Sequence, residues 1–153
     1  LSDEHMVLHD VPGACGNIDH VVLRKDGAVF VIETKSMRGR VEERNGQLQL
    51  NGKPPAKDFI RQTLRNVMWV RDILAAELGV TPWVDGALVF TRAYVSIRCD
   101  IEQIRVMNVR FLRKWMERIP KKGEIARRAA PKWERISKVL QTGVTGLPRK
   151  CSG

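Results

Sequence analysis

Three charged residues stand at the ends of two apolar segments. Asp19 precedes the first segment, and Glu33 and Lys35 close the second. Charged side chains there would lie beside a hydrophobic core, which is unfavourable unless they are paired or bind a ligand. Two neighbouring carboxylates repel each other unless a cation lies between them, and such oxygen ligands suit Mg²⁺ or Mn²⁺. Lys35 would then orient a metal-bound water or stabilise charge that develops on a phosphate.

The elements that must position these residues are two strands joined by a tight turn that contains Asp-Gly at residues 26–27. A two-residue turn there pairs Asp19 with Thr34 and puts Asp19 and Glu33 on opposite faces of the sheet. A three-residue loop over residues 25–27, with its glycine left-handed, pairs Asp19 with Glu33 instead. Because strand side chains alternate, this second register places all three charged residues on one face. We predict the second register.

A surface hairpin, in which acidic and basic residues merely pair across the strands, is the alternative interpretation. Both faces of the hairpin are apolar, however. One face carries Val21, Leu23, Val29 and Val31, and the other carries Val22, Phe30 and Ile32. A solvated hairpin has no need of two apolar faces, so the sequence favours a buried ribbon with a site at its end.

The motif Asn17-Ile18-Asp19-His20, a strand ending in Val31-Ile32-Glu33-Thr34-Lys35, and then Gly39 resemble the nuclease-related domain, NERD. That domain belongs to the PD-(D/E)xK nuclease superfamily. The resemblance extends over roughly residues 5 to 119. It implies that Asp19 and Glu33 bind the metal with the Thr34 carbonyl, and that Lys35 assists the attacking water.

The resemblance also covers a helix that follows the hairpin. Gln62 matches a glutamine that the family carries there, and its amide would position the substrate or the water. A plain surface glutamine is the alternative reading of this position. The superfamily core usually opens with a helix that carries a further acidic residue, whereas only Asp3 and Glu4 precede residue 5 here. The site predicted here therefore lacks the further acidic residue that the superfamily core usually supplies, unless Asp3 or Glu4 takes that role.

Composition narrows the class of protein. The 153 residues suffice for one domain with a real core, and no apolar run is long enough to cross a bilayer. The net charge of +10 favours a polyanionic partner, above all nucleic acid. Arg38 and Arg40 follow the proposed site and would hold phosphates, although both also suit an edge strand that resists aggregation. The three cysteines are odd in number and far apart, which argues against a disulfide framework and for a reducing cytoplasm.

The remaining pattern predicts an α/β or α+β layered fold, a restriction-endonuclease-like mixed sheet flanked by helices. We expect strands over residues 5–11, 47–50, 83–91 and 103–107, with residues 96–98 as a further extension of the sheet. A long helix should run from Pro54-Pro55 to about Leu78, and a second from Val109 to about Ile119. The stripe of the first helix is expected to contain Ile60, Leu64, Val67, Met68, Leu74 and Leu78. Phe111, Trp115 and Trp133 are interpreted as core packing rather than as a platform for bases.

We divide the chain into a NERD-like domain over residues 1–119 and a basic helical tail over residues 120–153, with a break at Pro131. The tail carries nine Lys or Arg against two Glu, and the closing Cys151 is too little to indicate a zinc ribbon. His5, His9, Cys15 and His20 match no tetrahedral zinc template.

The resulting hypothesis is Mg²⁺-dependent hydrolysis of phosphodiester bonds, in DNA rather than RNA. A non-catalytic nucleic-acid-binding module is the alternative, and a basic protein-interaction domain is a third. Strandedness, sequence preference and oligomeric state are not specified by the sequence.

Overall fold

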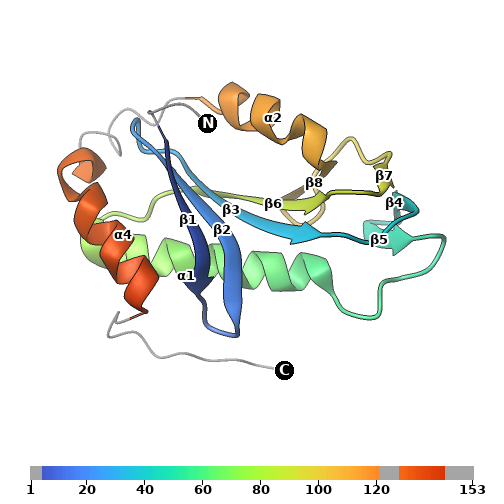
Figure 1. Cartoon of the computed structure of the whole chain (residues 1–153), viewed down its shortest axis with the longest axis horizontal. Helices are drawn as coiled ribbons and strands as arrows, with labels where there is room; N and C mark the ends of the chain where they lie inside the picture. Colours follow the sequence, from blue (N-terminus) through green and yellow to red (C-terminus); the bar gives the residue numbers. More distant parts are fainter. Residues whose placement is uncertain (1–4, 121–127, 144–153) are drawn as a thin grey trace.

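The computed structural model describes residues 5–120 and 128–143, which form two sheets and three α-helices (Figure 1). The strands are β1 (His5–Pro12), β2 (Asn17–Arg24), β3 (Val29–Lys35), β4 (Arg40–Arg44), β5 (Gln47–Leu50), β6 (Val84–Phe90), β7 (Tyr94–Val95) and β8 (Ile104–Asn108). The α-helices are α1 (Phe59–Leu78), α2 (Leu112–Arg118) and α4 (Trp133–Thr142), with 3-10 turns at Val109–Phe111 and Ala130–Lys132.

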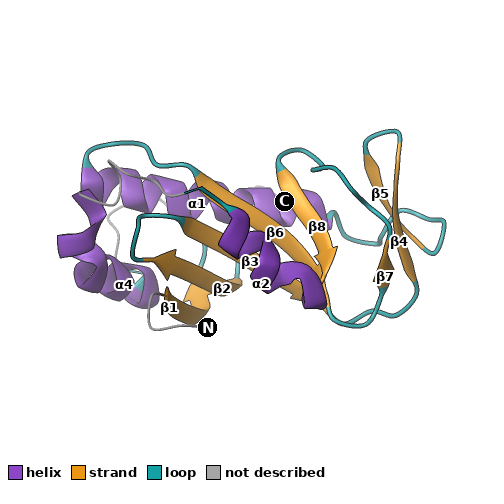
Figure 2. Ribbon diagram, turned by 90° about the horizontal axis from the view of Figure 1, so that it is seen from above, coloured by secondary structure: helices purple, strands orange, loops and turns teal. Residues whose placement is uncertain are grey.

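The main sheet has the strand order β1-β2-β3-β6-β8. Its first three strands are antiparallel neighbours, whereas β3, β6 and β8 run parallel to one another. The small sheet, in the order β5-β4-β7, lies beyond the carboxyl ends of the parallel strands (Figure 2). The prediction of an α+β fold with a mixed sheet flanked by helices is confirmed.

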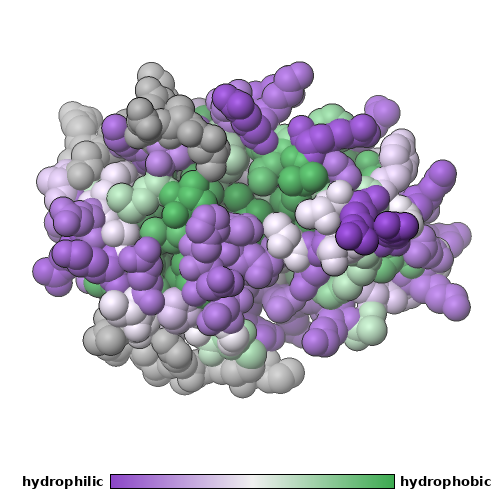
Figure 3. Space-filling model, in the orientation of Figure 1, coloured by the Kyte–Doolittle hydropathy of each residue, from purple (hydrophilic) through white to green (hydrophobic). Residues whose placement is uncertain are grey.

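Helix α1 covers one face of the main sheet, and α2 covers the other (Figure 1). Gly86 of β6 is needed for the close approach of α1, since a Cβ there would lie 2.6 Å from Val67 Cγ2 and 2.7 Å from Ile104 Cδ1. On the surface, hydrophobic side chains gather beneath α2, and hydrophilic ones surround them (Figure 3). The two core clusters bury residues on both faces of the sheet, as its apolar strands predicted.

The buried face of α1 differs from the predicted stripe. Met68 is 38% exposed, whereas Trp69, Val70 and Ile73 are buried. The helix begins at Phe59 with Asp58 as its N-cap and ends at Gly79, whose φ of 72° closes the last turn. Four members of the predicted stripe are buried, namely Ile60, Val67, Leu74 and Leu78. The face also buries two polar residues, Thr63 and Asn66, which a purely apolar pattern does not include.

Other differences concern the far end of the sheet. The extra strand is Tyr94–Val95 rather than residues 96–98, and it pairs with β4 in the small sheet. The predicted helix from Val109 begins as a 3-10 turn, so that Phe111 is 48% exposed and is not core packing. Trp133 is buried, as predicted, and Trp115 is half-buried.

The described part of the tail packs onto the main body. Ile136 and Leu140 of α4 are fully buried, and Arg135 Nε donates to Glu77 Oε2 of α1 at 2.9 Å. The predicted break at Pro131 coincides with the 3-10 turn before α4. The predicted linker from residue 144, Cys151 and the part of the tail helix before residue 128 lie outside the described residues.

Cys15 is disulfide-bonded, whereas Cys99 is free and exposed. The sequence argued against a disulfide framework, and Cys15 is an exception to that expectation. None of the helices within residues 5–120 and 128–143 combines the length and the apolar character needed to cross a membrane.

Candidate active site

The β2–β3 hairpin has the predicted register. Its ladder pairs His20 with Ile32 and Leu23 with Val29. Arg24 N donates to Ala28 O at 2.9 Å, which leaves a three-residue loop whose glycine, Gly27, has φ 95°. Continued by one residue, this register sets Asp19 opposite Glu33, as the bulged turn required.

The three charged residues share the face of the sheet that α1 covers. Val21 and Val31, which alternate with them along the strands, belong to the core beneath α1. Two polar residues of α1, Gln62 and Asn66, reach down to this face. The structure thus brings Asp19, Glu33, Lys35 and Gln62 together, at the ends of two adjacent strands and beside one helix.

Glu33 is the most deeply buried acid of the site, with only 2% of its surface exposed. Its Oε1 accepts a hydrogen bond of 2.7 Å from Asn66 Nδ2. Burial, followed by the negative charge of Asp19, raises the pKa of Glu33 from an ordinary 4.5 to about 7, although the Asn66 hydrogen bond opposes the rise. At neutral pH the Glu33 carboxylate is therefore poised between its charged and protonated forms.

Asp19 is fixed by the neighbouring strand rather than by the helix. Its Oδ2 accepts from Thr34 N at 2.9 Å and from Thr34 Oγ1 at 3.1 Å. The regular β2–β3 ladder ends at His20 and Ile32, so the Asp19 carboxylate takes up the next backbone donor of β3. This arrangement orients Asp19 at the end of the hairpin, and it shows that Thr34 contacts the Asp19 side chain directly.

Lys35 is held in place by two groups of α1. Its Nζ donates to Gln62 Oε1 at 3.3 Å and lies 4.5 Å from the centre of the Phe59 ring. The main-chain carbonyl of Lys35 also accepts from Thr91 N at 2.9 Å. An ammonium with one hydrogen bond and one aromatic face still has donors for a substrate.

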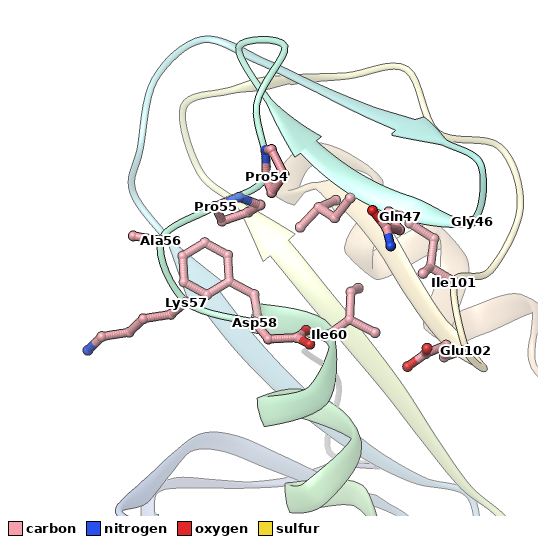
Figure 4. A pocket seen from close by; sticks show the side chains of 12 residues that line it. Gly46, Gln47, Pro54, Pro55, Ala56, Lys57, Asp58, Ile60, Ile101 and Glu102 are labelled. Atoms are coloured by element: carbon pink, nitrogen blue, oxygen red, sulfur yellow. The ribbon is translucent and has the colours of Figure 1, made fainter. Parts of the chain in front are cut away.

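Phe59 also lines a neighbouring cavity of about 420 Å³ between β5 and the start of α1 (Figure 4). Asp58 and Glu102 contribute carboxylates to its wall, and Lys57 extends away from it (Figure 4). Two acids and mainly uncharged neighbours make this cavity unsuited to a phosphate.

Arg38 and Arg40 lie apart from the carboxylates. Both are exposed, Arg38 between β3 and β4 and Arg40 at the start of β4. Arg40 Nη1 is 3.6 Å from Glu42 Oε1, and its guanidinium lies 5.7 Å from the centre of the Tyr94 ring. The structure therefore places these arginines on the small sheet and its approach, where they are accessible to a large ligand.

Asn66 is the site residue that sequence reasoning missed. It is 3% exposed, and its neighbour on the same face, Thr63, donates its hydroxyl to Phe59 O at 2.8 Å. A polar residue at a core position of an amphipathic helix was the available signal. A buried amide there requires a partner, and the partner is Glu33.

His20 lies on the opposite face of β2. Its Nδ1 is 2.8 Å from Nδ1 of His9, its partner across the β1–β2 ladder. Within residues 5–120 and 128–143, no group of three or more His, Cys, Asp or Glu side chains is arranged to hold a metal ion. The acids of the described site are thus a pair.

Comparison with protein families finds that residues 1–91 match the nuclease-related domain family, NERD. This span is more than half of the 153 residues, and it contains Asp19, Glu33, Lys35 and Gln62. Comparison with curated proteins and with solved structures finds no match. On the evidence of the matched span, the chain belongs to the nuclease-related domain family, which is affiliated with the PD-(D/E)xK superfamily.

Proposed function

We propose that this protein hydrolyses phosphodiester bonds of nucleic acid with the help of a divalent metal ion, and that its substrate is DNA. The observation that supports the proposal best is the meeting of Asp19 and Glu33 on one face of the sheet, with Lys35 two residues further along the same strand. A carboxyl group whose pKa is raised by burial and by a second acid, next to a lysine ammonium, is an arrangement expected at functional sites.

The residues fit a hard divalent cation. Burial and the charge of Asp19 raise the pKa of Glu33, so positive charge close to both carboxylates would favour their ionised forms. Asp19 and Glu33 would hold the ion, Mg²⁺ or alternatively Mn²⁺, with the Thr34 carbonyl as the third ligand that the family resemblance implies. When bound, such an ion supplies a water of lowered pKa and stabilises negative charge on the phosphate.

The chain's own groups have distinct roles in this proposal. Lys35, held by Gln62 and Phe59, offers its ammonium to the phosphate as negative charge develops there. Gln62 orients Lys35 and, at the same time, faces the position of the substrate. Asn66 keeps the Glu33 carboxylate turned towards Asp19.

Binding of the DNA backbone would come from exposed cations outside this cluster. Arg38 and Arg40 are accessible and lie on the segment that directly follows β3. Contacts from such residues go to phosphates and position the duplex without selecting a sequence. We therefore expect cleavage with little sequence preference.

The test is cleavage of supercoiled plasmid by the purified protein in Mg²⁺ and in EDTA. Glu33→Gln and Lys35→Met are compared with Glu134→Gln, which removes an exposed acid of α4. We expect nicking by the wild type and by Glu134→Gln in Mg²⁺ alone, and at least a hundredfold slower nicking by the two site variants. Equal rates for wild type and Glu33→Gln would contradict the proposal.

A non-catalytic nucleic-acid-binding module is the second candidate. It is favoured by the absence, among the described residues, of a third acidic group beside Asp19 and Glu33. Under this alternative the wild type binds DNA in Mg²⁺ but leaves the plasmid intact, and Glu33→Gln binds equally well.

A further inference from the structure

A second concave surface lies on the other face of the main sheet, between β7, β8 and α2. This surface, which we call the β8–α2 groove, has a volume of about 500 Å³. Its walls carry five cationic side chains and no Asp or Glu. The five are Arg98, Arg105, Arg110, Lys114 and Arg118.

Few of the groove's cationic side chains form ion pairs with the acidic residues that the structure describes. Arg105 lies 3.7 Å from Asp100, and it donates to the carbonyl of Arg98 at 3.0 Å. Among the described residues, Arg105 is the one cation of the groove in an ion pair, and the other four are exposed. Like charges held around one hollow attract an anionic ligand.

Aromatic side chains stand beside these cations. Tyr94 is 57% exposed and Phe111 is 48% exposed, and both line the groove. The Arg110 guanidinium lies 4.9 Å from the centre of the Phe111 ring. Trp115, in contrast, is half-buried and packs edge-on against Phe30 at 5.5 Å, so it shapes the floor. Exposed rings next to cations are the combination that binds unpaired bases and their phosphates.

The groove is separate from the acid pair but close to it. Asn108, which ends β8, pairs with Phe90, and Phe90 pairs with Lys35. The end of β8 is thus two strand spacings from Lys35, about 10 Å. Arg40 contacts the ring of Tyr94 and so connects the groove with the small sheet. A nucleic-acid strand that extends from the acid pair can therefore reach the groove by passing over this edge of the sheet.

We propose that the β8–α2 groove binds a single-stranded segment of nucleic acid. The arginines and Lys114 contact its phosphates, and Phe111 and Tyr94 stack against its bases. The volume falls in the range of about 300–1,000 Å³ that is typical of sites for drug-sized ligands, about the size of one or two nucleotides. A duplex would use the cations alone, because its bases are already stacked. This binding does not depend on hydrolysis at Glu33.

The experiment measures fluorescence anisotropy of a labelled oligothymidylate with the full chain in EDTA, where no metal-dependent cleavage occurs. Phe111→Leu tests stacking, and the double variant Arg110→Gln/Lys114→Gln tests phosphate binding. Arg113→Gln is the matched control, since Arg113 is exposed on the same helix, pairs with Glu117 and does not line the groove. Thermal unfolding verifies that each variant is folded.

We expect the double variant to weaken binding about tenfold or more and to reduce the slope of log K against log salt by about 1.4, at about 0.7 per phosphate contact. Phe111→Leu should weaken binding about fivefold for the single strand and less than twofold for a duplex of equal length. Arg113→Gln should change affinity less than twofold.

Equal losses in the double variant and in Arg113→Gln would show that net charge, not the groove, holds the oligonucleotide. An unchanged affinity of Phe111→Leu would likewise overturn the stacking role. Displacement of the oligonucleotide by polyglutamate of equal charge at the same concentration would assign the groove to an acidic protein segment instead. All of these binding measurements use EDTA, whereas the plasmid assay measures cleavage in Mg²⁺. A negative result in the binding measurements therefore does not affect the interpretation of the plasmid assay.

Discussion

At the scale of single residues, the behaviour of the site is set by the surroundings of Glu33. The carboxyl group is buried, faces Asp19 and has one donor, Asn66. Its folded pKa of about 7 lies above the ordinary value of 4.5. The proton that Glu33 retains links the stability of the metal-free protein to pH.

We predict that the free energy of unfolding in EDTA falls as pH rises from about 4.5 to about 7. Between these values the folded state binds more protons than the unfolded state, so raising the pH favours unfolding. The full loss is on the order of 3 kcal/mol, and it is complete above the folded pKa. Urea unfolding from pH 4 to pH 8.5 measures it.

Glu33→Gln provides the control for this experiment. Its amide carbonyl can still accept from Asn66, but it does not titrate. The difference in stability between wild type and Glu33→Gln should therefore grow with pH over the same window. Parallel pH profiles for the two proteins would contradict the environment described for Glu33.

We predict that Asn66→Ala destabilises the protein by about 1–3 kcal/mol, because a buried carboxyl group loses its donor. The pKa of Glu33 should rise further, since the Asn66 hydrogen bond lowers it. Chemical denaturation measures the first effect, and pH-dependent unfolding measures the second. Gln62→Ala, which removes a half-buried amide of the same helix face, should cost less than half as much. A smaller loss for Asn66→Ala than for Gln62→Ala would be inconsistent with the site.

The shared face of Asp19, Glu33 and Lys35 was predictable from the sequence. Side chains alternate along each strand, and the length of the turn sets the register between the two strands. Gln62 was singled out within the predicted helix by family resemblance, and the structure puts its amide against Lys35. The core position of Asn66 in the helix was a signal in the sequence, but its partner was not predictable, because Glu33 is more than thirty positions away. The roles of Asp19, Glu33, Lys35, Thr34, Gln62, Arg38 and Arg40 remain predictions.

At the scale of elements, Arg24 joins the hairpin to α2. It is 8% exposed, and its guanidinium donates to the carbonyls of Met116 and Ile119, both at 2.8 Å, and to Asp26 at 2.6 Å. Burial raises the pKa of Asp26, but the hydrogen bond and the charge of Arg24 outweigh this and lower it overall. Because Met116 and Ile119 lie more than ninety positions from Arg24, the sequence of the hairpin alone gave no indication of the contact with α2.

We predict that Arg24→Met destabilises the fold by about 2–4 kcal/mol, since it leaves the carbonyls at the end of α2 and the Asp26 carboxylate without their donor. The pKa of Asp26 should rise, so the remaining stability should depend less on pH in acid. Urea unfolding at pH 7 and pH 3 measures both effects.

Arg113→Met is the control for this prediction, because Arg113 is an exposed arginine of the same helix. It should change stability by less than about 0.5 kcal/mol. If Arg24→Met were equally mild, the hairpin and α2 would not be joined through this side chain.

At the scale of the whole molecule, the chain has a net charge of +10, and two groups of its cations lie close to the small sheet. Arg38 and Arg40 lie on the small sheet and its approach, and the β8–α2 groove is lined in part by Tyr94 and Val95 of the same sheet. The fold class could be predicted because strand and helix patterns are local. The packing of α4 onto α1 and the small sheet could not, since each depends on contacts between distant segments.

We predict that binding of duplex DNA in EDTA weakens steeply with salt. Each phosphate that is neutralised contributes about 0.9 to the slope of log K against log salt. The double variant Arg38→Gln/Arg40→Gln should therefore lower the slope by about 2. Anisotropy from 50 to 300 mM NaCl measures it, with Arg135→Gln as a control on α4. An unchanged slope in the double variant would exclude these arginines as phosphate contacts.

The ionisation of Glu33 can be measured directly at its own carboxyl group. Carbon-13 NMR of the Glu33 carboxyl gives its pKa in the presence of EDTA and of Mg²⁺. We expect a pKa of about 7 without metal and a fall of at least one unit when Mg²⁺ is added. A pKa near 4.5 in EDTA, or one that Mg²⁺ leaves unchanged, would contradict the claim that Asp19 and Glu33 form a buried acid pair that holds a divalent ion.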